Sequence, residues 1–150
     1  MASSDDFKLE RLKHILKQQD FLNEYSHKYL TFFQTISTAI ITAIFAVFAG
    51  WQKLSITADM AIVTIRALEL LLSFISIFVA VVIATNIFSW WDYRKDEANI
   101  FNEIVSQDFR KQPSLKGIWR WFEFWFLVVV VCLSFGIIIF VEYFAIPLIK

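Results

Sequence analysis

Four threonines recur in this 150-residue chain at spacings that place their hydroxyls on one face of a helix. Thr31, Thr35, Thr38 and Thr42 are separated by four, three and four residues, and Phe45 extends the same face. In an oligomer, this face predicts a water-filled path that is lined by hydroxyls and narrowed at a gate of Phe45 rings, which closes by dewetting. The same residues suit close packing between membrane helices without any pore, which is their more common use. The sequence leaves both interpretations open.

A single amide, Asn86, interrupts another apolar stretch of the chain. Buried polar groups at membrane depth need hydrogen-bond partners and often mark function. Thr85, Ser89 or the Asn86 of a second copy are available as partners. We therefore expect Asn86 and Ser89 to form a polar contact between helices, which either sets the register of the helices or serves a function.

Residues suited to catalysis or metal binding are sparse. His14 and His27 are the only histidines, and they lack the spacing typical of metal ligands. Glycines stand only at positions 50, 117 and 136, which excludes a glycine-rich phosphate loop. No serine or threonine lies in a motif that would supply a histidine base. The sequence predicts no enzyme, no metal site and no cofactor.

The elements that position these residues follow from the distribution of charge. Hydrophobic residues make up 58% of the chain and charged residues 19%. Three windows contain no charge: Tyr29 to Gln52, Leu70 to Trp91 and Phe124 to Val141. Each is continuously apolar and close to the roughly 20 residues that cross a bilayer as a helix. The predicted fold class is an all-α integral membrane protein with three transmembrane helices.

The flanking lysines and arginines predict the orientation of these spans. The N-terminal segment and the second loop carry eleven of them, against three in the first loop and the C-terminus. Because such residues favour the cytosolic side, we expect a multi-pass protein of the inner (plasma) membrane, with its N-terminus in the cytosol and its C-terminus outside. Tryptophans near the window ends mark the membrane boundaries.

Helical patterns continue outside the spans. Leucines at helical spacing predict an N-terminal amphipathic helix from about residue 5 to 26. An apolar stripe from Trp91 to Phe109 predicts that the second span extends into the cytosol, before a loop at 113–117. The predicted segments are a cytosolic amphipathic helix at 1–27, spans at 28–52, 67–91 and 119–146, an outer loop at 53–66, a cytosolic helix and loop at 92–118, and an outer tail at 147–150.

Charges outside the spans balance locally rather than between domains. Basic and acidic residues number five each through Lys28, two each from Lys53 to Glu69 and six each from Asp92 to Glu123. This pattern favours pairing between the cytosolic helices, or assembly with other copies, over nucleic acid or anionic lipid. Two pairs at i, i+3 are expected at the membrane boundaries, Arg66 with Glu69 and Arg120 with Glu123. A ring of Glu69 or Glu142 at the outer mouth would attract cations.

The helix that leaves the second span carries Trp91-Asp92-Tyr93-Arg94, then Ala98 and Phe101-Asn102-Glu103-Ile104. This stretch resembles the post-membrane helix of small bacterial oligomeric membrane proteins of the RipA-like and SLATT-type families, the latter being effectors in antiphage and stress operons. The resemblance covers 15 to 20 residues. It implies oligomerising spans and a membrane effector triggered by a soluble sensor protein or a nucleotide-type ligand. The third span departs from the two-span SLATT layout.

Three functions are compatible with these patterns. The leading hypothesis is a homo-oligomeric membrane channel or pore-forming effector, with a role in bacterial antiviral or stress defence, that is gated through its cytosolic helices. The second is a non-conducting anchor that recruits a soluble partner. The third is a holin-like lesion former, which the predicted cytosolic N-terminus disfavours. Expected partners are the lipid bilayer, further copies of the chain and a soluble signal, without nucleic acid.

Overall fold

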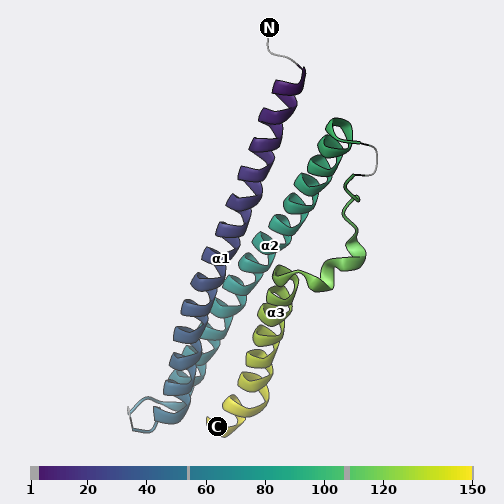
Figure 1. Ribbon diagram of the computed structural model, residues 1–150. Helices are drawn as coiled ribbons and strands as arrows, with labels where there is room; N and C mark the ends of the chain where they lie inside the picture. The colour runs from purple at the N-terminus through teal and green to yellow at the C-terminus, as the bar shows by residue number, and fades with distance from the viewer. Residues whose placement is uncertain (1–3, 54, 107–108, 150) are drawn as a thin grey trace. The chain divides into compact units, whose positions relative to one another are not determined.

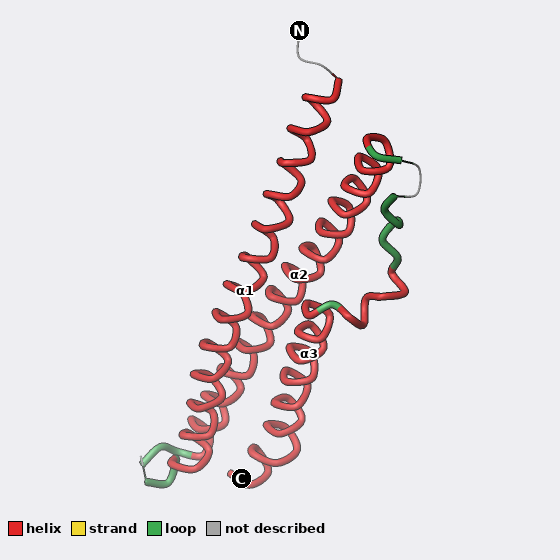
Figure 2. The backbone as a smooth tube through the Cα atoms, viewed as in Figure 1, coloured by secondary structure: helices red, strands yellow, loops and turns green. Residues whose placement is uncertain are grey.

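The computed structural model describes residues 4–53, 55–106 and 109–149, and every regular element in them is a helix (Figure 2). Two long helices come first, α1 at Ser4–Gly50 and α2 at Ala58–Ile104. They are followed by a 3₁₀ helix, η1, at Leu115–Arg120 and by α3 at Phe122–Phe140. The chain ends with a π-helical turn, η2, at Val141–Ala145 and with α4 at Ile146–Ile149 (Figure 1).

Three of these helical stretches are long and apolar enough to cross a membrane: Asp6–Gly50, Ala58–Ile104 and Phe122–Ile149. The second and third stretches contain their charge-free windows entirely, whereas the first ends at Gly50, two residues before the end of its window. The prediction of an all-α chain with three long apolar helices is therefore confirmed, and the chain is a candidate multi-pass membrane protein. The N-terminal amphipathic helix and the first window as far as Gly50 form one unbroken helix, since neither glycine nor proline precedes Gly50.

The chain divides into two compact units. The first unit comprises Met1–Lys28 and Val82–Trp125, and the second comprises Tyr29–Val81 and Phe126–Lys150. In the second unit, α1, α2 and the C-terminal helices share an aliphatic core that includes Ile44, Ile65 and Val141, all fully buried. Branched aliphatic side chains at helical spacing on three helices explain this core, since each helix buries one stripe against the others.

The first unit combines the N-terminal half of α1 and the C-terminal half of α2 with the connecting segment, η1 and the first turn of α3. Leu12 and Ile15 of α1 pack with Ile100 of α2 in a small buried cluster. Ion pairs flank this cluster, one between Lys8 and Glu103 and one between Arg11 and Asp96, each at 3.2 Å. The two amphipathic helices thus pair with each other inside one chain, through the mixed-sign charges that the sequence showed.

The first connection is shorter than predicted. The outer loop was expected at 53–66, but α2 already begins at Ala58. The Thr57 hydroxyl accepts a hydrogen bond of 3.3 Å from the Met60 N–H, and Asp59 lies in the first turn. This capping chemistry starts the helix well before the charge-free window.

The second connection also differs from the expected one. The apolar stripe predicted a helix through Phe109, but α2 ends at Ile104. After the end of the helix, the Asn102 side chain bonds to the backbone of Arg110. Its Oδ1 accepts from the Arg110 N–H at 2.8 Å, and its Nδ2 donates to the Arg110 carbonyl at 3.1 Å. The predicted loop at 113–117 is partly helical, because Ser114 caps the 3₁₀ helix by accepting from the Lys116 N–H.

The third helical stretch continues into the predicted tail. A span at 119–146 and a tail at 147–150 were expected, but 122–149 are helical and residue 150 lies outside the described part. Pro147 explains the π-helical turn before it. Its ring has no N–H and would clash with the carbonyl four residues earlier, and the wider turn lets the Ile146 N–H reach the Val141 carbonyl instead.

Candidate functional site

The threonine face predicted from the sequence lies on the surface of the second unit. Thr31, Thr35, Thr38 and Thr42 of α1 are all exposed in the single chain. The Thr35 hydroxyl donates to the Thr31 carbonyl at 2.8 Å, so it is satisfied within the helix. The structure therefore exposes this face of α1 to water, lipid or a further copy of the chain.

The exposed surface of α1 differs in composition from that of α2. Between Thr31 and Ala49, ten positions of α1 are exposed; eight are Thr, Gln or Ala, and the other two are Phe32 and Phe45. Between Leu70 and Val81 of α2, by contrast, all six exposed positions carry large apolar side chains. Large apolar surfaces suit lipid, whereas small and hydroxyl-bearing surfaces suit contact between helices or a path for water.

Phe45, the predicted gate, is 46% exposed and is held from behind by an aromatic contact. Its ring centroid lies 5.0 Å from that of Phe140 in α3, and Phe48 contacts the same ring at 5.8 Å. Such pairs restrain ring position beyond simple burial. The contact with Phe140 at the end of α3 therefore restrains the orientation of the Phe45 ring on α1.

Asn86 meets a partner that the sequence did not single out. Its Nδ2 donates to the Ser26 hydroxyl of α1 at 3.5 Å, a long contact within the first unit. Ser89 is half-buried and has no hydrogen bond to Asn86 in the described part of the chain. Asn86 thus contacts α1 through Ser26, and the expected contact with Ser89 is not seen among the described residues.

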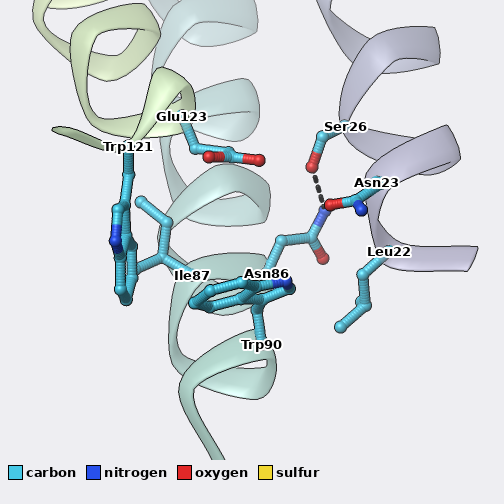
Figure 3. Close-up of a pocket in the computed structure, with 8 residues that line it drawn as sticks. All are labelled: Leu22, Asn23, Ser26, Asn86, Ile87, Trp90, Trp121 and Glu123. Carbon is cyan, nitrogen blue, oxygen red and sulfur yellow. Dashed lines mark hydrogen bonds between the residues drawn. The ribbon is translucent and has the colours of Figure 1, made fainter. Parts of the chain in front are cut away.

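A cavity of about 140 Å³ opens beside this contact (Figure 3). Its polar lining residues are Asn23, Ser26, Asn86 and Glu123, and its apolar ones are Leu22, Ile87, Trp90 and Trp121. The indole rings of Trp90 and Trp121 meet edge to face at a centroid distance of 4.8 Å. The cavity combines aromatic walls with amide, hydroxyl and carboxylate groups.

The most buried charge of the first unit is Glu97, whose side chain is 2% exposed. Gln19 of α1 donates to its Oε2 at 3.0 Å, and Arg94 donates to the same oxygen at 2.9 Å. Arg110, beyond the end of α2, donates to Oε1. We call Glu97, Gln19, Arg94 and Arg110 the Glu97 clasp, because it ties two helices and the connecting segment to one carboxylate.

The clasp keeps this carboxylate ionised. Burial alone would raise the pKa of Glu97, but the hydrogen bonds from Gln19 and Arg94 and the charges of Arg110 and Arg94 outweigh it, so its pKa lies below the usual value of 4.5. Sequence reasoning missed Glu97 because a charged helix face is usually solvated. One signal was available: Glu97 stands three residues before Ile100 and four after Tyr93, on the face that buries Ile100.

The charged residues at the far end of the second unit pair differently from the prediction. Arg66 was expected to pair with Glu69, but its Nη2 lies 3.3 Å from the Glu142 carboxylate of η2. Glu69 is buried between the core residues Ile65 and Leu72 rather than exposed at a rim. The predicted Arg120–Glu123 pair is likewise absent from the described residues, and Glu123 lines the cavity of the first unit instead.

Within the described ranges, no three His, Cys, Asp or Glu side chains lie close enough together to bind a metal ion. His14 and His27 are both exposed, and the ring of His27 lies 6.1 Å from that of Phe122. No protein-family model, curated protein or solved structure matches this chain.

Proposed function

We propose that this chain is the subunit of a homo-oligomeric membrane channel in which α1 lines the conducting path. The threonines of α1 face the path, and a ring of Phe45 side chains forms its gate. The first unit lies in the cytosol and receives the signal, from a soluble protein or a nucleotide-type ligand, that opens the gate in a defence or stress response.

The observation that carries this proposal is the contrast between the exposed faces of the long helices. A single chain in lipid would place Thr31, Thr35, Thr38 and Thr42 against hydrocarbon, where hydroxyls gain nothing. Assembly of several copies around α1 removes this face from lipid and leaves the apolar faces of α2 and α3 outside. Oligomers of this kind expose large apolar residues outward and small polar ones inward.

A groove beside the threonines of α1, which Ser37 lines, supports the same assembly. Ser37 is 3% exposed, and its hydroxyl has no hydrogen-bond partner in the described part of the chain. It lines a groove of about 260 Å³ between α1 and α3, together with Gln34 and Thr38. A helix from a neighbouring copy, seated in this groove, would pack against the Gln34 and Thr38 side chains that flank Ser37.

Gating through the first unit follows from the continuity of α1. The helix runs from Ser4 to Gly50, so Gln19 of the Glu97 clasp and Phe45 belong to the same helix. A ligand that competes for Glu97 or its arginines would free the N-terminal half of α1. In the proposed mechanism this release lets α1 rotate or tilt and withdraws Phe45 from the path.

Ion flux through liposomes that contain the purified full-length chain tests this function. We expect Phe45→Ala to raise the basal flux on the order of tenfold, which needs only about 1.4 kcal/mol off the barrier. Thr38→Leu should lower the flux of the opened channel. Matched controls are Phe74→Ala, at a lipid-facing position that is 73% exposed, and Thr64→Leu, whose hydroxyl bonds its own helix as Thr35 does. Absence of flux under every trigger, or equal effects of test and control variants, would overturn the proposal.

A second candidate function is a non-conducting anchor for a soluble protein. The observation that favours it is the exposure of large apolar side chains on the N-terminal part of α1, where Phe7, Leu9 and Leu16 all remain uncovered. Such residues outside the charge-free windows are typical of a protein-binding surface. An anchor would show no flux in liposomes, and it would remain monomeric or dimeric in detergent.

A further inference from the structure

The cavity of the first unit has the chemistry of a cation site. None of its eight lining residues carries a positive charge, and one, Glu123, carries a negative charge. Glu123 has no ion-pair partner among the described residues. Arg94 lies over the Trp90 ring at 5.1 Å, but its guanidinium donates to Glu97 rather than to Glu123. A carboxylate without a counter-ion at the wall of a cavity favours a cationic ligand, because opposite charges attract.

The polar groups of the cavity come from three different segments. Ser26 extends from α1, Asn86 from α2 and Glu123 from the first turn of α3, and Figure 3 shows all three side chains reaching into the same space. The Asn86 Nδ2 donates to the Ser26 oxygen, and Figure 3 shows the Asn86 oxygen pointing away from Ser26 and Glu123. A ligand with several N–H donors can bond to the Glu123 carboxylate and to the Ser26 hydroxyl, which face the same space.

Aromatic rings complete the site. Trp90 and Trp121, at a centroid distance of 4.8 Å, present indole surface to the cavity. The faces of indole rings attract cations, and the attraction strengthens where water is excluded. Carboxylate and indole together are the groups that recognise ammonium ions.

The sequence position of the lining residues gives the depth of the cavity in a membrane. Leu22, Asn23 and Ser26 precede the first charge-free window, Trp90 stands one residue before the end of the second, and Glu123 directly precedes the third. All three segments thus cross the same boundary of the predicted spans, where tryptophans and lipid headgroups gather. A ligand at this depth is presented either by a headgroup or by the adjoining water.

We propose that this cavity binds a primary ammonium group, held by the Glu123 carboxylate and the Ser26 hydroxyl against the two indole rings. The N–H donors of a primary ammonium match these acceptors, whereas a quaternary ammonium has no N–H to donate. A cavity of about 140 Å³ accommodates an ethanolamine group. The site is independent of the proposed channel, since an anchor would hold the same ligand.

Lipid retention by the purified full-length chain tests the site. The chain is equilibrated in detergent with equal amounts of phosphatidylethanolamine, phosphatidylcholine and phosphatidylglycerol, and native mass spectrometry counts the bound lipids. A second arm titrates free ethanolamine and free choline and follows tryptophan fluorescence. We expect a preference for the primary over the quaternary amine on the order of tenfold, typical of a hydrogen bond to a charged group, and the responding arm identifies the source.

Glu123→Gln should abolish this preference, whereas Glu142→Gln, which removes a carboxylate of the second unit, should preserve it. Circular dichroism checks that both variants keep their helices. Equal binding of primary and quaternary amines in both arms would overturn the proposal with the unmodified chain alone, so the result does not depend on the folding of any variant. A preference for phosphatidylglycerol, or one that survives Glu123→Gln, would also overturn it.

Discussion

Replacement of Glu97 by glutamine probes the clasp with a minimal change of shape. The substitution keeps the size of the side chain and its ability to accept from Gln19, but it removes the charge that faces Arg94 and Arg110. Two guanidinium groups then lose their common counter-ion. The substitution therefore tests whether the Glu97 carboxylate holds the first unit together.

The expected cost follows from burial. Unpairing a buried charge costs about 3–5 kcal/mol. Glu97 is 2% exposed, but the side chains of Arg94 and Arg110 are 35% and 33% exposed, so water can solvate part of the freed charge. We therefore take the lower limit, about 3 kcal/mol, which is a factor of roughly 100 in the equilibrium between the closed and open first unit.

Hydrogen exchange of the full-length chain in detergent micelles measures this opening directly. Backbone amides at 12–19 and 93–104 should exchange roughly 100-fold faster in Glu97→Gln, because exchange reports the free energy of local opening. Glu103→Gln is the matched control: Glu103 lies on the same helix, is 62% exposed and pairs with Lys8, so its loss costs about 0–1 kcal/mol. Equal exchange rates in the two variants would refute the assignment of the clasp as the main tie.

Acid should weaken the clasp in the unmodified chain. The pKa of Glu97 is lowered in the folded state, so its stabilisation is complete above the unfolded value of 4.5 and is lost as the pH falls through the lowered pKa. The difference in opening between the unmodified chain and Glu97→Gln should therefore be constant near neutral pH and shrink below pH 4.5. A difference that disappears well above this pH would contradict the direction of the shift.

Three further predictions concern single contacts. Asn102→Ala should cost about 1–3 kcal/mol and speed proteolysis near Arg110, since both bonds that fold the chain back after α2 are lost; unchanged cleavage would count against this role. Ser37→Ala should leave the thermal stability of a monomeric chain unchanged or raised, because it removes a buried hydroxyl without a partner, and a clear loss in the monomer would show that a bond exists. Glu142→Gln should change the free energy of unfolding by less than about 1 kcal/mol, since its pair with Arg66 is exposed. A larger loss would contradict the assignment of this ion pair as a weak surface contact.

The three long apolar helices and the position of Thr31 to Thr42 on one face of α1 were predictable because they depend on local pattern. Uncharged windows of sufficient length and the spacing of Thr31 to Thr42 need no tertiary information. The limits of the helices were less predictable. Thr57 starts α2 early through a capping bond, and Asn102 ends it early through bonds to a residue eight positions away, so side-chain contacts decide both ends.

The polar contacts of the first unit were not predictable for a related reason. In the sequence, Glu97 and Glu103 are two equivalent carboxylates of a mixed-charge helix. Only their interaction partners in the folded chain distinguish the buried Glu97 from the exposed Glu103. Gln19 lies 78 residues from Glu97 and Arg110 lies beyond a break in the helix. The same holds for Arg66, whose partner Glu142 comes from the last helical segment rather than from the adjacent turn.

The most direct test of the proposed channel is the mass of the purified particle. The chain has a mass of 17.6 kDa, and a path lined by α1 requires several copies around one axis. Light scattering or mass photometry of the detergent-solubilised protein, corrected for bound detergent, should give a multiple of this mass above that of a dimer. Thr38→Leu should alter this assembly or its flux. A homogeneous monomer or dimer that conducts no ions would contradict the account and favour the anchor.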